Sequence, residues 1–472
     1  MVVPFRGRSG PRSVPFLFFL AALLPFGSSA AFDRRHPDPS VRAPAPAHGA
    51  LSDARPSSPT PAAAGGLDLN QLIALAERDN KDLQAARYAI DVGRARLLQA
   101  GLRPNPRLDL AARSDFLFNN EGEYALSAGI SQDFPIAGRI LRQKDVARVD
   151  IALAEAEVAN AQRRVAEDIA AKYYRLLVSD KQVATLDGLV GVDEKLAKTT
   201  RNRFRAAEVS ELDVNTVQID IQRLILERTL LQSEQLAITA ALNTLIGRAP
   251  ATPLRVVGPL PVSETVPELG QLQQRALLQR PDFQSAMLGV DRAAAEKALA
   301  RALRWQDWSV GLELAQDRQS IQGAPPQSAD RAIGVTLSIP LPLFNKSQGL
   351  IAEADANRNQ ALARVDALRL GILGEVGGAH AEAVRLQALL GEFGKTYLPV
   401  GERNVRLARI GYDMGLIPVF DVVQAQRQLA ELNKSYLATL DQFLQALVRL
   451  HAAAGDYAPV SLETRQHNQG SR

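Results

Sequence analysis

Few residues of this chain have side chains that commonly carry out catalysis or bind metal ions. Its 472 residues include five histidines, no cysteine and three methionines. The histidines stand far apart in the sequence, at His36, His48, His380, His451 and His467. No HExxH pattern, glycine-rich phosphate loop or nucleophile elbow is present, and without thiolates a soft-metal site is not expected. We therefore expect a protein that is not an enzyme and that holds no cofactor or metal.

Charged side chains do recur at every second position in two short stretches, the spacing that places side chains on one face of a β-strand. The residues on this predicted polar face are Arg107, Asp109, Arg113, Asp115, Glu313 and Asp317. The positions between them are apolar, and in the first stretch they are Leu108, Leu110, Ala112, Phe116 and Phe118. A strand with one apolar and one polar face suits a boundary between lipid and water. It also suits a small soluble sheet packed on a helical core, and the pattern alone leaves both open.

The alternating pattern occurs four times, in two predicted β-hairpins. The first hairpin spans residues 107–136 and the second spans 308–344, each with a polar, turn-rich segment in its middle. The last predicted strand reads "IGVTLSIPLPLF" (333–344), with an apolar residue at every second position. Stretches of about ten to twelve two-faced residues are long enough for a tilted membrane-spanning strand.

The remainder of the chain is predicted to be helical, and the order of its elements occurs twice. "GISQDFPI" (129–136) matches "GVTLSIPL" (334–341), and "FRAAEVSELDVNTVQ" (204–218) matches "YDMGLIPVFDVVQAQ" (412–426). Apolar residues at seven-residue spacing in the long helices predict coiled-coil packing. The predicted fold class is therefore mainly α with a small β part, in two similar halves.

Each half is predicted to contain one helix, one β-hairpin and one long helical hairpin. The first repeat is placed at 67–258, with a helix over about 68–102 and a helical hairpin at 138–247. The second repeat is placed at 259–456, with a helix over about 267–303 and a helical hairpin at 346–455.

The N-terminal region has the features of an export signal. The net charge is +4, and Arg6, Arg8 and Arg12 supply three of these charges. An apolar run and small residues before position 31 follow them, so residues 1–30 are predicted to be a signal peptide. Residues 31–66 are rich in Pro, Ala and Ser and are predicted to be a disordered leader, and 457–472 a flexible tail. The nearly neutral remainder gives no reason to expect nucleic acid as a partner.

Export and two-faced strands together favour an outer-membrane location. Four strands are too few to close a transmembrane barrel, and open edges are not tolerated in lipid. A barrel shared between several copies of the chain resolves this conflict. Two copies would supply eight strands, which enclose room only for side chains. Three copies would supply twelve and leave a channel, so we expect a homotrimer whose lumen is lined by the six charged residues of the predicted polar face.

The repeated order of helix, hairpin, long helix, turn and long helix resembles the TolC family of outer-membrane efflux ducts. "LRPNP" before the first strand and "GVTLSIPLPLFNKSQG" (334–349) are similar to the CzcC-like heavy-metal efflux branch. The resemblance covers about Leu67 to Gly455. It implies a trimeric, twelve-stranded β-barrel in the outer membrane of a Gram-negative bacterium, continuing into a long periplasmic α-helical tunnel. It also implies docking to a periplasmic adaptor (membrane fusion) protein and an inner-membrane resistance-nodulation-division pump.

Within this resemblance, "YDMGLIPVFDVVQ" (412–424) is similar to the periplasmic tip where such ducts meet adaptors or close. Tyr412, Gly415 and Asp421 match the pattern of TolC. Ile417, next to Pro418, stands where TolC has a basic gate residue, and Gln424 stands where TolC has an acid.

The acidic residues of the two turns also have a structural explanation. Ser210 and Asp213 approximate a capping box at the first turn, so capping is expected to outweigh gating for Asp213. For Asp421, a role in stabilising the helix N-terminus and a role in gating fit equally well.

The sequence therefore predicts a passive outer-membrane channel of a tripartite efflux system, exporting heavy-metal cations. A TolC-type duct for drugs or other organic compounds is the alternative within the family. A periplasmic coiled-coil adaptor or scaffold protein is the alternative outside transport. An adaptor is expected to have one helical hairpin flanked by β-rich modules, and a scaffold leaves the four two-faced strands without an explanation.

Overall fold

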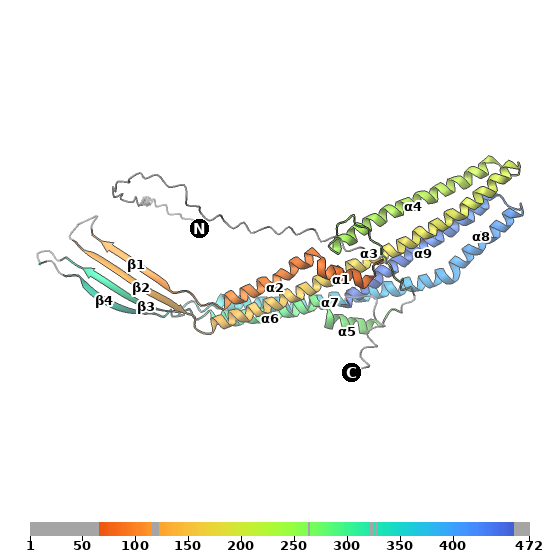
Figure 1. The fold of residues 1–472 in the computed structure, drawn as a ribbon. Helices are drawn as coiled ribbons and strands as arrows, with labels where there is room; N and C mark the ends of the chain where they lie inside the picture. Colours follow the sequence, from red (N-terminus) through yellow and green to blue (C-terminus); the bar gives the residue numbers. More distant parts are fainter. Residues whose placement is uncertain (1–65, 116–121, 263–264, 321–324, 326–327, 457–472) are drawn as a thin grey trace, which may run out of the picture. The chain divides into compact units, whose positions relative to one another are not determined.

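The computed structural model describes residues 66–456 except 116–121, 263–264, 321–324 and 326–327. The predicted signal peptide, all of the leader but Gly66, the tail, and Phe116 and Phe118 lie outside these residues. The described part is mainly helical with one small antiparallel sheet, as the sequence predicted. In Figure 1 the sheet lies at one end of the helices, and the turns of the long helical hairpins lie at the other.

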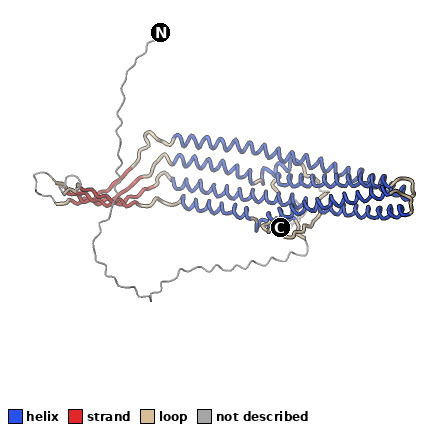
Figure 2. The backbone as a smooth tube through the Cα atoms, turned by 90° about the horizontal axis from the view of Figure 1, so that it is seen from above, coloured by secondary structure: helices blue, strands red, loops and turns tan. Residues whose placement is uncertain are grey.

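The elements occur in the same order in each half of the described chain. In the first half they are α1 (Leu69–Asp79), α2 (Lys81–Ala100), β1 (Arg107–Ser114), β2 (Tyr124–Phe134), α3 (Arg139–Arg205) and α4 (Glu211–Leu245). In the second half they are α5 (Leu269–Gln279), α6 (Pro281–Ala302), β3 (Trp308–Arg318), β4 (Asp330–Ser338), α7 (Gln348–Glu392), the π-helix η1 (Phe393–Tyr397), α8 (Leu398–Asp413) and α9 (Val419–Ala453). Figure 2 shows the helices running side by side away from the strands.

The opening helix of each half is broken in two, so the single helices predicted at 68–102 and 267–303 are wrong. In the first half Asn80 ends α1 and caps α2, because its side-chain oxygen accepts from the Leu83 backbone N–H at 2.9 Å. Its side-chain N–H₂ also donates to the Leu245 carbonyl at 2.8 Å, which ties the break to the end of α4. In the second half Pro281 is the first residue of α6, where its missing N–H costs nothing.

The fourth strand is shorter than predicted. β4 ends at Ser338, so the expected strand over 333–344 is wrong in its second half. Pro340 and Pro342 have no backbone N–H to offer a neighbouring strand. The 2.8 Å hydrogen bond from the Leu343 N–H to the Leu341 carbonyl is a local turn. In the same way β2 ends at Phe134, directly before Pro135.

The long helical hairpins turn at 206–210 and 414–418. α3 is a single helix of 67 residues, whereas its counterpart in the second half is interrupted by the π-turn η1 between α7 and α8. No helix among the described residues combines the length and the apolar character needed to cross a membrane.

Two clusters of buried apolar side chains hold the helices together. The larger lies where α1, α5 and the middle of α3 meet α7 and α9, and it contains Leu72, Ile169 and Phe443, all fully buried. The smaller joins α3, α4, α8 and α9 near the turns, and it contains Val217, Val422 and Tyr412. Figure 1 shows these helices lying alongside one another toward the turns.

The end of α9 is held by two buried arginines. Arg163 donates to the carbonyl of Ala452 at 3.2 Å, and Arg280 donates to the carbonyl of Ala453 at 3.3 Å. These carbonyls belong to the last turn of the helix, which has no internal partners for them and carries partial negative charge. Arg280 also pairs with Asp282 and Glu375, both at 2.6 Å. The two arginines therefore fix the C-terminal end of the helix that contributes most to the larger core cluster.

Replacing Phe443 with alanine is expected to lower the free energy of unfolding by about 3–5 kcal/mol, because a fully buried ring leaves a cavity. The matched control is Phe420→Ala on the same helix, since Phe420 is 55% exposed. That change is expected to cost less than about 1 kcal/mol. Urea unfolding of the detergent-solubilised protein measures both. Equal losses for the two variants would contradict the assigned core.

Candidate functional site

One face of the sheet is apolar across all four strands. The strand order is β1-β2-β3-β4 with every neighbouring pair antiparallel. Leu110, Ala128, Leu314 and Ile333 form one row across the four strands, because each lies opposite the next in the register. One neighbouring row contributes Leu108, Ile130, Leu312 and Val335, and the row on the other side contains Ala112 and Leu126 followed by the polar Gln316 and Arg331. Most of these large side chains are exposed, Val335 at 76%, so within one chain this face covers no core.

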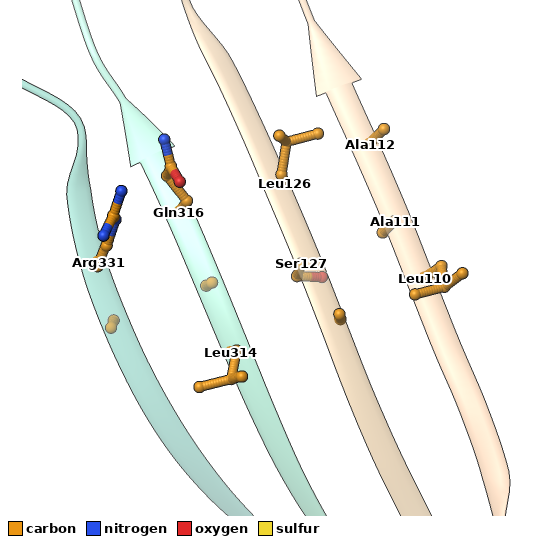
Figure 3. Close-up of a pocket in the computed structure, with 11 residues that line it drawn as sticks. Leu110, Ala111, Ala112, Leu126, Ser127, Leu314, Gln316 and Arg331 are labelled. Carbon is orange, nitrogen blue, oxygen red and sulfur yellow. The ribbon is translucent and has the colours of Figure 1, made fainter.

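Figure 3 gives a close view of the part of the sheet near its loops. Leu110, Leu126 and Leu314 project from three neighbouring strands, with Gln316 and Arg331 nearer the loop ends of theirs. An open depression of about 580 Å³ crosses the four strands here. Besides these residues it is lined by the row Ala111, Ser127, Ala315 and Ala332. The small side chains of this row belong to the opposite, polar face.

The polar face carries more acids than bases. Within the paired strands its charged residues are Arg107, Asp109, Arg113, Asp133, Glu313, Asp317 and Asp330. Of the two arginines, Arg107 is already paired with Asp133 at 2.8 Å. Asp115, which the sequence placed on this face, follows directly after β1, and its backbone N–H donates to the Glu123 carbonyl at 3.3 Å.

One row of the polar face alternates acids with glycines. Asp109 lies opposite Gly129, Gly129 opposite Glu313, and Glu313 opposite Gly334. The Asp109 carboxylate accepts a hydrogen bond from the Ser131 hydroxyl at 3.0 Å. Since glycine adds no side chain between them, the two acids of this row face open space.

The two outer strands of the sheet each have an unpaired edge. Among the described residues β1 pairs only with β2, and β4 pairs only with β3. An antiparallel sheet of four strands with one exposed apolar face and two open edges is incomplete in either water or lipid.

At the far end of the helices, Tyr412 joins the two helical hairpins. Its side chain is 2% exposed, and its hydroxyl shares a 3.1 Å hydrogen bond with the Thr200 hydroxyl. The Arg203 guanidinium lies over the Tyr412 ring at 4.7 Å and donates to the Tyr412 carbonyl at 2.9 Å. The sequence pattern pointed to Tyr412 but not to Thr200 and Arg203, because contacts across more than two hundred residues leave no local pattern.

The capping box predicted at the first turn is confirmed. The Asp213 backbone N–H donates to the Ser210 hydroxyl at 3.3 Å, and the Ser210 N–H donates to the Asp213 carboxylate at 2.9 Å. These bonds satisfy backbone groups that the first turn of a helix leaves without partners.

The other residues singled out at the second turn divide between structural positions and open surface. Gly415 has a φ of +72°, which favours glycine. Ile417 is half-buried against the smaller core cluster, and Pro418 is the N-cap of α9. Asp421 and Gln424 are exposed in the first two turns of α9.

The described residues include no group of three or more histidine, aspartate or glutamate side chains placed to bind a metal ion. His380 contacts the Pro267 carbonyl at 3.1 Å, whereas His451 lies 3.5 Å from the Asp456 carboxylate, so the two histidines have different partners.

The fold is a long helical bundle that carries a small two-faced sheet at one end. A family model described as outer membrane efflux protein matches residues 72–248 and 272–456, and the chain therefore belongs to the outer membrane efflux protein family. This result confirms the assignment to TolC-type ducts. It favours an outer-membrane efflux channel over a periplasmic adaptor or a scaffold protein. This family is not a family of enzymes.

Individual relatives agree with the family. The cobalt-zinc-cadmium resistance protein CzcC of Cupriavidus metallidurans is 24% identical over 397 residues, covering 83% of this chain and 91% of that protein. A crystal structure of CusC superposes with a TM-score of 0.68 at 18% identity, covering 83% of this chain and 93% of that one. The outer membrane protein VceC of Vibrio cholerae gives a TM-score of 0.63 at 20% identity, with coverages of 82% and 96%.

Arginine on the apolar face is expected to oppose membrane insertion. Val335→Arg would place a charge in lipid and is expected to cost about 2–4 kcal/mol at mid-membrane depth. The control is Thr336→Arg, one residue along β4 on the polar face, for which a change below about 1 kcal/mol is expected. Folding into liposomes during urea titration measures both. Equal penalties at the two positions would show that the faces are assigned wrongly.

Proposed function

We propose that three copies of this chain close a twelve-stranded barrel, with the apolar sheet face toward lipid and the polar face toward a water-filled lumen. The unpaired edges of β1 and β4 support the closure, because their backbone groups have no water to bind in a bilayer. Eight strands would leave too little space for a channel, so three copies of the four-stranded sheet are favoured over two.

The internal repeat predicts the register between copies. "LDLA" (108–111) in β1 corresponds to "LELA" (312–315) in β3, and Gly129 in β2 corresponds to Gly334 in β4. Where the two halves meet within the chain, Gly129 lies opposite Glu313. The same pairing at the free edges places Gly334 opposite Asp109 of the next copy. The row of acids and glycines would then continue around the whole lumen.

The helices also expose apolar residues at a spacing suited to packing against neighbouring copies. On α4, Leu212, Ile219 and Leu226 repeat every seven residues and are 73%, 65% and 61% exposed. On α8, Leu407 and Ile410 are also more than half exposed. Apolar stripes at this spacing are typical of helices that pack against a partner helix. They support continuation of the barrel into a helical tunnel.

The cargo that best fits the polar face is a cation, and we propose divalent heavy-metal cations. The observation that carries this proposal is that the paired strands place five acids but two arginines on the polar face. Rings of acidic side chains favour cations in channels. The relation to a cobalt-zinc-cadmium resistance protein supports metals over organic compounds. With no group of ligands in the described residues, the ions would pass hydrated rather than bound.

The proposed partners are a periplasmic adaptor protein and an inner-membrane pump that supplies the energy. The turns at 206–210 and 414–418 would meet the adaptor, since Leu212 and Phe420 are exposed in equivalent positions of the two halves. The residues proposed to close or dock this end are Tyr412, Gly415, Ile417, Pro418, Asp421, Gln424, Ser210 and Asp213. The Tyr412–Thr200 hydrogen bond supports a closed state in which the two hairpins are tied together.

Removing the acids of the alternating row is expected to reduce cation selectivity. The double variant Asp109→Asn with Glu313→Gln would remove six charges per trimer without changing side-chain size. Reversal potentials across planar bilayers in a potassium chloride gradient should shift toward zero. The control Gln316→Asn alters a polar side chain on the other face and should leave the potential unchanged. An unaltered potential in the double variant would contradict the role of this row.

A strain lacking the chain is expected to become hypersensitive to metals. Growth would be compared on zinc, cobalt, cadmium, copper, silver and several hydrophobic drugs, with the wild-type gene restored as the control. Sensitivity confined to metals supports the proposed cargo. Sensitivity to drugs alone would retain the channel and exclude metal export as its function.

A further inference from the structure

A buried carboxylate pair lies within the helical part, away from the sheet and about two to three turns inside the end of the α3–α4 hairpin. Asp193 on α3 is 3% exposed, and Asp220 on α4 is 2% exposed. Two arginines reach Asp220: the Nε of Arg427 on α9 at 2.7 Å and the Nε of Arg223 at 3.2 Å, both to Oδ1. Asp220 is therefore neutralised by direct ion pairs, whereas Asp193 depends on charges that interact with it only through space.

The three arginines around Asp193 attract its carboxylate less strongly than their number suggests. Arg223 and Arg427 are 39% and 36% exposed, so water screens them. Arg223 also faces Glu431 at 3.8 Å. The remaining positive group is Arg409 on α8. On α3 itself the nearby acid Asp187 is engaged with Arg228 at 2.8 Å.

A side-chain amide on α9, one residue before Arg427, lacks hydrogen-bond partners. Gln426, the residue before Arg427, is 5% exposed, and neither its side-chain oxygen nor its side-chain nitrogen has a partner. A buried polar group without a partner is costly, so α9 is not fully satisfied where it packs on the α3–α4 hairpin. A neutral carboxylic acid can donate a hydrogen bond, whereas a carboxylate cannot.

We propose that Asp193 is a proton-binding site that tightens the packing of α8 and α9 on the α3–α4 hairpin when it is protonated. The proposal goes beyond the efflux function, since it concerns the packing of helices and does not require the chain to conduct ions. Four elements contribute charged groups to the site: α3 with Asp193, α4 with Asp220 and Arg223, α8 with Arg409, and α9 with Arg427. Anything that changes the charge of Asp193 acts on all four.

The direction of the effect follows from the surroundings of the carboxyl group. Burial and then the Asp220 charge raise the pKa of Asp193 to about 6, while the three arginines oppose the shift. Because the packed state holds the proton more tightly than an opened state, its added stability is complete below the ordinary aspartate range. This stability is lost as the pH rises to about 6 and is constant above that. A proton would therefore strengthen the packing in a mildly acidic periplasm.

Hydrogen–deuterium exchange of the full mature chain in detergent tests the proposal. Exchange of segments 186–200 and 419–430 would be followed from pH 7 to pH 5 and corrected for the intrinsic pH dependence of exchange. Local opening of these segments is expected to fall about tenfold from pH 7 to pH 5. Opening that stays constant between pH 7 and pH 5 would overturn the proposal.

Two variants localise the effect. Asp193→Asn resembles the protonated acid in shape and should give strong protection at every pH, with the pH dependence lost. Asp187→Asn, on the same helix but 51% exposed at its side chain, should keep the dependence of the wild type. A wild-type pH dependence that survives in Asp193→Asn would assign the proton to another group. Because the readout is local exchange, failure here leaves the bilayer and growth results untouched.

Discussion

The constraint on which the rest of this structure depends is the unpaired backbone at the two edges of a two-faced sheet. An exposed edge in water invites further pairing, and an exposed edge in lipid leaves N–H and C=O groups without any partner. The apolar face is unfavourable in water, and the polar face is unfavourable in lipid. A sheet of this kind becomes satisfied only when its free edges pair with further strands, and the long helices that follow each hairpin then have to pack around a common axis.

Because the chain contains the same structural unit twice, one type of strand contact can serve both within a copy and between copies. The contact between halves, where β2 pairs with β3, already shows how one half meets the next. Repeating that contact between copies uses the same acids, glycines and leucines in the same register. In the proposed trimer the exposed leucines of α4 would pack between copies in the same repeated way. One interface, used both within and between copies, can therefore generate a closed ring from a small sequence unit.

Much of the fold could be predicted because its elements have strong local periodicity. The two-residue alternation located β1 to β4, and the seven-residue spacing of apolar residues located the long helices. The breaks at Asn80 and Pro281 were missed although both residues are common helix starters, because apolar residues continue on either side. The prolines at 340 and 342 were read as part of a strand, since their spacing preserved the alternation although they cannot donate hydrogen bonds. The tie between Tyr412 and Thr200, and the burial of Asp193, depend on contacts between helices distant in sequence, for which one sequence carries no signal.

In the proposed trimer, β4 of one copy pairs with β1 of the next in the register that the repeat predicts. The chain has no cysteine, so a pair can be introduced cleanly at Ala111 and Ala332, which the register places opposite each other between copies. Oxidation, or a short thiol cross-linker, should convert Ala111→Cys with Ala332→Cys into a covalent trimer on denaturing gels. Ala112→Cys with Ala332→Cys puts the two thiols on opposite faces and should stay monomeric. A monomer from the first pair, or equal cross-linking from both, would contradict the account.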